Sequence, residues 1–167
     1  MNELFVYKSK KIHGDKYDYS LVNYINNKTK VEIICSEHGI FKQRPTDHLN
    51  GCGCPICRES KGEKKIRNFL NEKKIKFLPQ YKFNNCKHIL QLSFDFYLPE
   101  YNICIEYNGI QHYKPIEKFG GKNQFLIQNK CDNIKKEFCL KNNIKLIIIK
   151  YDNNILDELT NKLKYEK

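Results

Sequence analysis

Four side chains in the first third of the chain are spaced like the ligands of a metal ion. Cys35 and His38 are separated by two residues, as are Cys54 and Cys57, and fifteen residues lie between the pairs. Two close pairs separated by an insert of hairpin length are typical of zinc sites with sulfur and nitrogen ligands. A segment this small buries too little surface to fold alone, so a metal would hold it together. The spacing therefore predicts a structural Zn²⁺.

The surrounding sequence predicts how these ligands are held. The first pair falls in a hairpin turn and the second opens a helix, which is the arrangement of a treble clef, and helix N-terminal amides stabilise thiolate charge. Cys52 and His48 are rival ligands, although Cys52 is separated from Cys54 by Gly53 alone, so both sulfurs would reach one metal only with strain. His13 is expected to be a hydrogen-bonding residue of a turn.

A second group of polar residues interrupts two apolar strands further along the chain. In FDFYLPEYNICIEYNGIQHY, residues 94 to 113, Asp95 lies in the first strand and Glu106 in the second. Pairing across the short turn between them can bring both carboxylates onto one face, a few ångströms apart. Two desolvated carboxylates repel unless a cation neutralises them. A hard cation with oxygen ligands, such as Mg²⁺, fits this requirement, and Mn²⁺ is a possible substitute.

Other polar residues flank these two strands. Glu63 opens the helix before them, where it can supply a third acid, and Asp132 lies one turn from Lys135 on a later helix. The second strand ends in a dense group of polar side chains, namely Asn108, Gln111 and His112. The imidazole of a histidine titrates close to neutral pH and can therefore accept a proton from water.

The hydrophobic pattern predicts an α/β (α+β) chain in which helices cover a mixed sheet. From residue 61 onward the expected order is helix, three strands, helix, strand, helix. Residues 1–58 are expected to form a small zinc module and residues 59–167 a second domain. The expected helices cover 2–12, 61–74, 125–143 and 154–164, and the expected strands 31–35, 39–44, 76–83, 90–98, 102–107 and 144–150.

The charge of the chain points to a polyanionic partner. The 167 residues contain 30 Lys and Arg against 19 Asp and Glu, a formal net charge of +11. Of these 30 cations only 3 are Arg, which favours attraction to phosphate over readout of guanine. Residues 1–60 carry net +2 and residues 61–167 net +9. We therefore expect the chain to bind nucleic acid, with no membrane partner and a location inside the cell or host cell.

Residues 60–151 resemble the PD-(D/E)XK nuclease superfamily, and within it the very-short-patch-repair branch that includes the EDxHD homing endonucleases of phages. That branch is similar in having a helix Glu, a strand Asp, a variable position, a His and a later helix Asp. The stretch FDFYLP…IEYNGIQHY carries most of the resemblance. The matching positions in this sequence are Glu63, Asp95, Glu106 as the variable position, His112 and Asp132.

The resemblance implies a Mg²⁺-dependent endonuclease that hydrolyses phosphodiester bonds in double-stranded DNA. Asp95 and Glu106 would bind the metal, and Glu63 would complete its shell directly or through water. His112 would act as general base or hold the metal-bound water. Asp132 would orient His112 or a second cation.

One position departs from the superfamily pattern. The usual Lys two residues after the second acid is Asn108 in this sequence. The resemblance therefore implies that His112 orients the water, with Gln111 helping to position it. Lys114 or Lys135 could stabilise the phosphorane.

Residues 5–57 resemble a zinc module often attached to phage and large-virus homing endonucleases, where it is thought to bind DNA. The resemblance implies that this module supplies DNA affinity and that the chain is encoded by a phage or virus. The candidate DNA contacts are Lys28, Lys30, Lys42 and Arg44 in the module, and Lys114 and Lys135 in the nuclease domain.

Two other functions stay open at this point. A zinc-dependent nucleic-acid-binding protein on a degenerate nuclease fold would have the same charge and zinc spacing, and a transposase-like or RNA-cutting enzyme would use the same chemistry. Carboxylates that face phosphate would weaken a protein that only binds nucleic acid, which favours the nuclease. The oligomeric state, monomer or homodimer, is not predicted.

Overall fold

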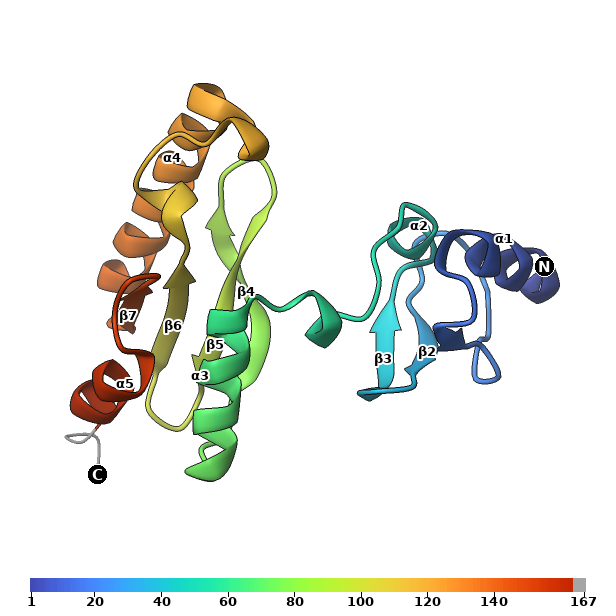
Figure 1. The fold of residues 1–167 in the computed structure, drawn as a ribbon, viewed down its shortest axis with the longest axis horizontal. Coiled ribbons are helices and arrows are strands. Elements are labelled where there is room, and N and C mark those ends of the chain that lie inside the picture. The colour runs from blue at the N-terminus through green and yellow to red at the C-terminus, as the bar shows by residue number, and fades with distance from the viewer. Residues whose placement is uncertain (164–167) are drawn as a thin grey trace. The chain divides into compact units, whose positions relative to one another are not determined.

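The chain divides into two compact units, Met1–Ser60 and Lys61–Lys167, and the computed structural model describes residues 1–163 (Figure 1). We call them the N-terminal and the C-terminal unit and describe each by itself. The predicted boundary lay between residues 58 and 59. None of the helices in residues 1–163 is both long enough and apolar enough to cross a bilayer.

The N-terminal unit is a small antiparallel sheet covered by two helices. Strand β2 pairs with β3 in a hairpin and with β1 on its other edge. Along β2, Val31, Ile33 and Cys35 alternate into the core, which is the period of a strand with one buried face. In the described chain the elements are α1 (Asn2–His13), β1 (Tyr17–Asp18), β2 (Val31–Cys35), β3 (Gly39–Gln43), α2 (Pro45–Leu49) and the 3₁₀ turn η1 (Ile56–Arg58).

The C-terminal unit is a mixed sheet between two layers of helices, as predicted. The strand order is β4-β5-β6-β7, with β4, β5 and β6 antiparallel and β7 parallel to β6. The parallel pair requires a crossover, and α4 provides it. In residues 61–163 the elements are α3 (Lys61–Glu72), β4 (Leu78–Lys87), β5 (Gln91–Leu98), β6 (Ile103–Asn108), the 3₁₀ turns η2 (Ile110–His112) and η3 (Glu117–Phe119), α4 (Gly121–Lys141), β7 (Lys145–Lys150) and α5 (Ile155–Leu163).

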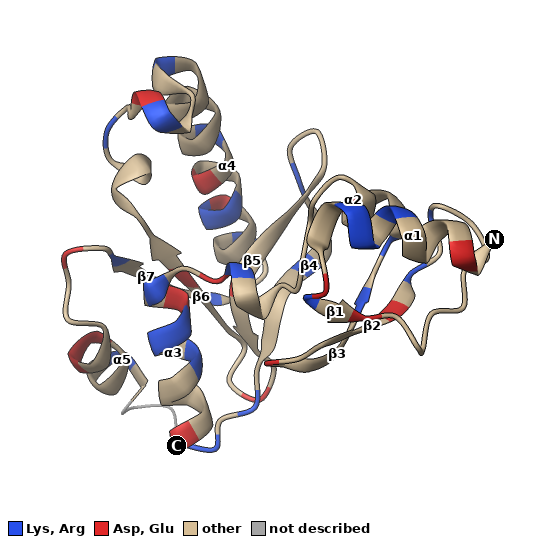
Figure 2. Cartoon of the chain, turned by 45° about the vertical axis from the view of Figure 1, so that its right-hand side comes forward, with Lys and Arg blue, Asp and Glu red and all other residues tan. Residues whose placement is uncertain are grey.

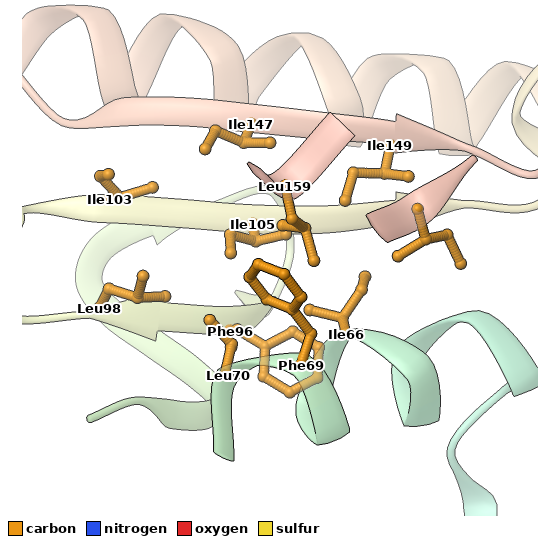
Figure 3. Packing of buried hydrophobic residues seen from close by; sticks show 11 residues of the cluster. Ile66, Phe69, Leu70, Phe96, Leu98, Ile103, Ile105, Ile147, Ile149 and Leu159 are labelled. Carbon is orange, nitrogen blue, oxygen red and sulfur yellow. The ribbon is translucent and has the colours of Figure 1, made fainter. Parts of the chain in front are cut away.

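Two apolar clusters hold these layers together. One face of the sheet packs against α3 and α5, and Figure 3 shows the side chains of that cluster. The other face packs against α4 through a cluster that contains Cys86, Phe94, Cys104 and Cys139. These thiols are therefore core residues, as expected for cysteines outside the zinc motif. The first cluster consists of Ile66, Phe69, Leu70, Phe96, Leu98, Ile103, Ile105, Ile147, Ile149, Ile155 and Leu159.

The predicted elements differ from the structure at a few points. The second cysteine pair opens only the three-residue turn η1, and the following helix α3 begins at Lys61. Few aligned amides therefore face these thiols, and the predicted stabilisation by a helix N-terminus is small. The strand β1 is absent from the expected strands, because two residues carry no detectable strand period.

Candidate functional site

The four predicted zinc ligands converge in the N-terminal unit. Their ligand atoms all lie within 4.8 Å of one another. His38 Nδ1 is 3.7 Å from Cys35 Sγ, 3.8 Å from Cys54 Sγ and 3.3 Å from Cys57 Sγ. The sulfurs of Cys35 and Cys57 are 3.6 Å apart. A tetrahedral zinc site with ordinary bond lengths has edges of about 3.6–3.8 Å, so these side chains could bind zinc without large movement.

Ionisation of the thiols also favours a cation at this position. Burial, together with the neighbouring thiols of Cys35 and Cys54, raises the pKa of Cys57 to about 12. Burial also opposes ionisation of Cys35, but hydrogen bonds from the backbone N–H groups of Glu37 and His38 lower its pKa to about 7. Several buried thiolates become stable together only when a metal ion neutralises them.

The glycine between Cys52 and Cys54 is required by a close contact. The backbone N–H of Cys54 donates to the Tyr17 hydroxyl at 2.9 Å. A Cβ added to Gly53 would lie 2.3 Å from the same hydroxyl oxygen. Any larger residue at Gly53 would therefore push Tyr17 away and misplace Cys54.

The rival ligands have other roles. His48 is fully buried, and its Nδ1 lies 2.9 Å from Gln43 Oε1 and 3.0 Å from the Cys52 carbonyl oxygen. Both partners are acceptors, so Nδ1 carries the proton and Nε2 accepts from the Tyr19 hydroxyl at 3.0 Å. Burial, followed by the charge of His13, lowers the pKa of His48 to about 4, so its ring is neutral. His13 Nε2 donates to the His48 carbonyl oxygen at 2.8 Å.

We expect one zinc ion per chain. Cys57→Ser should remove it and unfold the N-terminal unit, because that unit then loses a ligand of its structural metal. Cys52→Ser is the matched control and should keep full zinc content, because Cys52 lies outside the cluster. Elemental analysis together with thermal unfolding measures both effects. Full zinc content in Cys57→Ser would contradict the assignment.

The two strand acids meet in the C-terminal unit, where the ladder between β5 and β6 ends. These strands pair from Phe96↔Ile105 onward. One step further, the backbone N–H of Asp95 donates to Glu106 Oε1 at 3.3 Å, and the backbone N–H of Tyr107 donates to Asp95 Oδ2 at 2.8 Å. Each carboxylate therefore accepts the N–H of the opposite strand in place of a backbone carbonyl. The predicted close approach of the two acids is present in the structure.

Asp95 lies where the side-chain alternation of β5 breaks. Phe94 packs in the cluster below α4, whereas Phe96 packs in the cluster below α3 and α5, although the two are only two residues apart. On the neighbouring strand, Gln80 has φ of 49°, a backbone conformation that a residue with a side chain adopts at some strain. Its amide Nε2 lies 3.4 Å from Asp95 Oδ1. Sequence reasoning missed Gln80, because no residue pattern signals this conformation.

Lys135 pairs with the second acid. Its Nζ donates to Glu106 Oε2 at 2.8 Å, and both side chains are close to nine-tenths buried. Lys135 was predicted to contact DNA or to stabilise the phosphorane. The structure places its ammonium group, carried by α4, beside the carboxylate of Glu106.

His112, in the turn η2, and Asp132, on α4, form a second pair. His112 Nδ1 donates to Asp132 Oδ2 at 2.8 Å, which leaves Nε2 with the lone pair. Gln128 Nε2 donates to the other carboxylate oxygen of Asp132 at 2.9 Å. Gln128, Asp132 and Lys135 lie at i, i+4 and i+7 of α4, so they share one face. Sequence reasoning missed Gln128, although its spacing to Asp132 was a usable signal.

The other predicted site residues surround these pairs. Glu63, in the first turn of α3, is close enough for its charge to raise the pKa of Asp95. Gln111 folds back over Gly109, where an added Cβ would lie 2.4 Å from its Oε1. Gly109 has φ of −67°, a backbone conformation that any residue adopts. Lys114 is exposed.

The pKa values of the acids reflect their crowding. Burial, followed by the charge of Glu106, raises the pKa of Asp95 to about 8. Burial also raises the pKa of Glu106, although Lys135 opposes the shift. Burial tends to raise the pKa of Asp132, but His112, Gln128 and Lys135 together outweigh it and lower this pKa. Lys135 alone therefore does not neutralise both Asp95 and Glu106.

We expect stability of the folded chain to fall as pH rises from about 4 to about 8 in magnesium-free buffer. The folded pKa of Asp95 lies above its ordinary value, so ionisation penalises the folded state across that range. Asp95→Asn should flatten this dependence and be more stable than the parent at pH 8 by roughly 2–5 kcal/mol. Chemical unfolding at several pH values measures this, and identical pH profiles for parent and variant would contradict it.

The predicted DNA contacts of the N-terminal unit lie on or beside its hairpin. Lys28 follows a turn closed by the Asn26 side chain, and Lys30 and Arg44 are exposed. Lys42 Nζ pairs with Glu32 at 3.0 Å across the hairpin. Both groups of that pair are well exposed, so phosphate can replace the glutamate at little loss.

Comparisons with known proteins concern mainly the N-terminal unit. Residues 1–58 match a family described as "Protein of unknown function (DUF723)". Uncharacterized protein R892 of Acanthamoeba polyphaga mimivirus is 43% identical over 60 residues, 35% of this chain and 22% of that protein. Uncharacterized protein 307L of Invertebrate iridescent virus 6 is 41% identical over 75 residues, 44% of this chain and 38% of that protein.

These relatives are viral proteins, which agrees with the expected viral origin. The chain spans less than two fifths of the length of either relative. No solved structure matches the chain.

Proposed function

We propose that the chain is a divalent-metal-dependent DNA endonuclease. The observation that carries this proposal is the group formed by Asp95, Glu106, Lys135 and the His112–Asp132 pair at the end of β5 and β6. Two acids in contact, a lysine beside them and an oriented imidazole are the parts that phosphodiester hydrolysis requires. The resemblance of residues 60–151 to PD-(D/E)XK nucleases supports the same reading.

The charge balance of this group supports binding of a hard cation. Lys135 is the lysine in contact with Glu106, whereas the charges of Glu63 and Glu106 both act on Asp95. A pKa of about 8 for a strand carboxyl indicates that this balance is incomplete. Asp95 and Glu106 would hold Mg²⁺ through oxygen ligands. Such a cation, when bound, would polarise the scissile phosphate and lower the pKa of a bound water.

The protein's own residues have separate tasks in this scheme. His112 Nε2 accepts a proton from the attacking water, since Nδ1 already donates to Asp132. Asp132, held by Gln128, fixes the ring orientation and stabilises the imidazolium that forms. With a cation bound at Glu106, the Lys135 ammonium group would be available to stabilise negative charge on the phosphate oxygens. Zinc in the N-terminal unit supplies structure, and that unit adds DNA affinity.

One observation favours a protein that only binds nucleic acid. Apart from the zinc ligands, no group of three His, Cys, Asp or Glu ligand atoms converges in residues 1–163, and Lys135 already neutralises Glu106. On this alternative the lysine has replaced the catalytic cation. The raised pKa of Asp95 argues against it, because a site adapted to lysine alone would not keep a second, poorly neutralised acid.

Supercoiled plasmid separates the two functions. The zinc-loaded protein should convert it to nicked circles with Mg²⁺ or Mn²⁺ and leave it intact without a divalent cation. Each chain carries one such group in its described part, so nicks should appear before linear product. Binding of the plasmid without any product in either cation would favour the alternative. Cleavage of a single-stranded RNA in preference to the plasmid would move the substrate class to RNA.

A further inference from the structure

The hairpin between β4 and β5 ends in two exposed aliphatic side chains. Ile89 is 85% exposed and Leu90 is 79% exposed. The turn is well formed, because Lys87 pairs with Gln91 and the His88 N–H donates to the Leu90 carbonyl oxygen at 3.2 Å. In Figure 2 the loop that joins β4 and β5 stands apart from helix α4. Adjacent exposed aliphatic groups on a defined turn are suited to insertion into a partner.

The arms of this hairpin match a polyanion. Residues 78–94, which form β4, the turn and the first half of β5, contain two lysines and no Asp or Glu. Lys82 and Lys87 are exposed on β4 itself. A cationic stem that ends in an apolar tip complements DNA, which has phosphates along its edges and stacked, apolar base faces inside.

The tip also lies at the end of the sheet that carries the proposed catalytic group. β5 and β6 are antiparallel with Phe96 opposite Ile105, so the start of β5 and the end of β6 are directed toward the same edge of the sheet. His112 follows the end of β6, and Leu90 precedes the start of β5. Asp95 lies five positions after Leu90, which corresponds to about 17 Å of strand, or about five base-pair steps.

We propose that Ile89 and Leu90 insert between base pairs of duplex DNA from the minor groove and kink it toward the catalytic group. This inference deepens the proposed nuclease function and rests on it for the position of the cut. The lysines on the stem neutralise phosphates on either side of the groove, and the aliphatic tip occupies an unstacked step. The kink lies about five base pairs from the scissile phosphate.

The test compares two double variants and one control in the full, zinc-loaded chain. Ile89→Ser with Leu90→Ser removes the apolar tip, and Lys82→Gln with Lys87→Gln removes charge from the stem. Leu140→Ser is the matched control, because Leu140 is 80% exposed on α4 and lies outside the hairpin. Substitutions at such exposed positions leave stability nearly unchanged, and thermal unfolding verifies this.

Bending is measured first, in magnesium-free buffer, so that it does not depend on cleavage. A short duplex labelled at both ends reports bending by energy transfer, and 2-aminopurine placed at successive positions reports the unstacked step. The parent and Leu140→Ser should bend the duplex and raise the 2-aminopurine signal at one step. The tip variant should bind with affinity within about threefold of the parent but give neither signal, whereas the stem variant should bind more weakly with a smaller salt dependence.

Nicking then connects the tip to catalysis. The tip variant should nick a fully paired duplex about 10–100-fold more slowly than the parent, because the base-pair step must then unstack without an inserted aliphatic side chain. A duplex with two mismatched pairs about five base pairs from the cut should restore its rate to near that of the parent. Parental bending and unstacking by the tip variant would overturn the inference. If the parent bends DNA but never nicks it, the proposed nuclease function fails, whereas the insertion of Ile89 and Leu90 into DNA is supported.

Discussion

Replacing His112 with alanine should lower the rate of DNA nicking by about 10²–10⁴-fold while DNA binding stays within about twofold. The reason is the direction of the ring. Nδ1 donates to Asp132 at 2.8 Å, so Nε2 is the nitrogen left to accept a proton from water. The side chain is not a core residue of either apolar cluster, and its removal should not unfold the chain. Single-turnover nicking of supercoiled plasmid at saturating Mg²⁺ measures the effect.

Two further variants distinguish a base from a structural residue. Asp132→Asn should lose about 10–100-fold, since it keeps the side-chain volume but weakens the hydrogen bond that orients the ring. Asn133→Ala, an exposed position on the same helix, is the control and should retain the parental rate. Added imidazole should restore part of the activity of His112→Ala, which a purely structural role would not allow. Parental nicking by a folded His112→Ala protein would place the catalytic group elsewhere.

Asp95→Asn should abolish both nicking and the response to Mg²⁺. At a concentration 100 times its dissociation constant, Mg²⁺ should stabilise the parent by about 2.7 kcal/mol, because it binds the folded state. Asparagine can still accept the Tyr107 N–H, but it supplies no charge to a cation. The variant should therefore fold, melt at the same temperature with and without Mg²⁺, and nick at least about 10³-fold more slowly than the parent.

The control for this prediction is another carboxylate of the same unit. Asp157 is exposed on α5, and Asp157→Asn should keep the Mg²⁺ response and the nicking rate. Glu106→Gln is a less specific test, because it also leaves the buried ammonium group of Lys135 without its charged partner. An Asp95→Asn protein that is still stabilised by Mg²⁺ would show that the cation binds at other residues.

The zinc ligands and the order of elements were predictable from the sequence. Paired Cys and His residues at this spacing are typical of metal sites, and ligands two residues apart stay close whatever the rest of the fold does. The apolar runs of β5, β6 and β7 are local signals in the same sense, since each run is visible in the sequence of its own strand. The closeness of Asp95 and Glu106 also followed, because a short turn joins their strands.

The tertiary structure decided the contacts that involve distant segments. Lys135 reaches Glu106 from a helix 29 residues later, and Gln80 meets Asp95 from a neighbouring strand. Neither contact follows from local pattern, because each depends on how α4 and β4 pack against the sheet. The break in alternation that sends Phe94 and Phe96 to opposite faces is likewise a property of three paired strands. The sequence thus determined which residues are candidates for the chemistry, and packing decided which of them meet, because contact between distant segments depends on the whole fold.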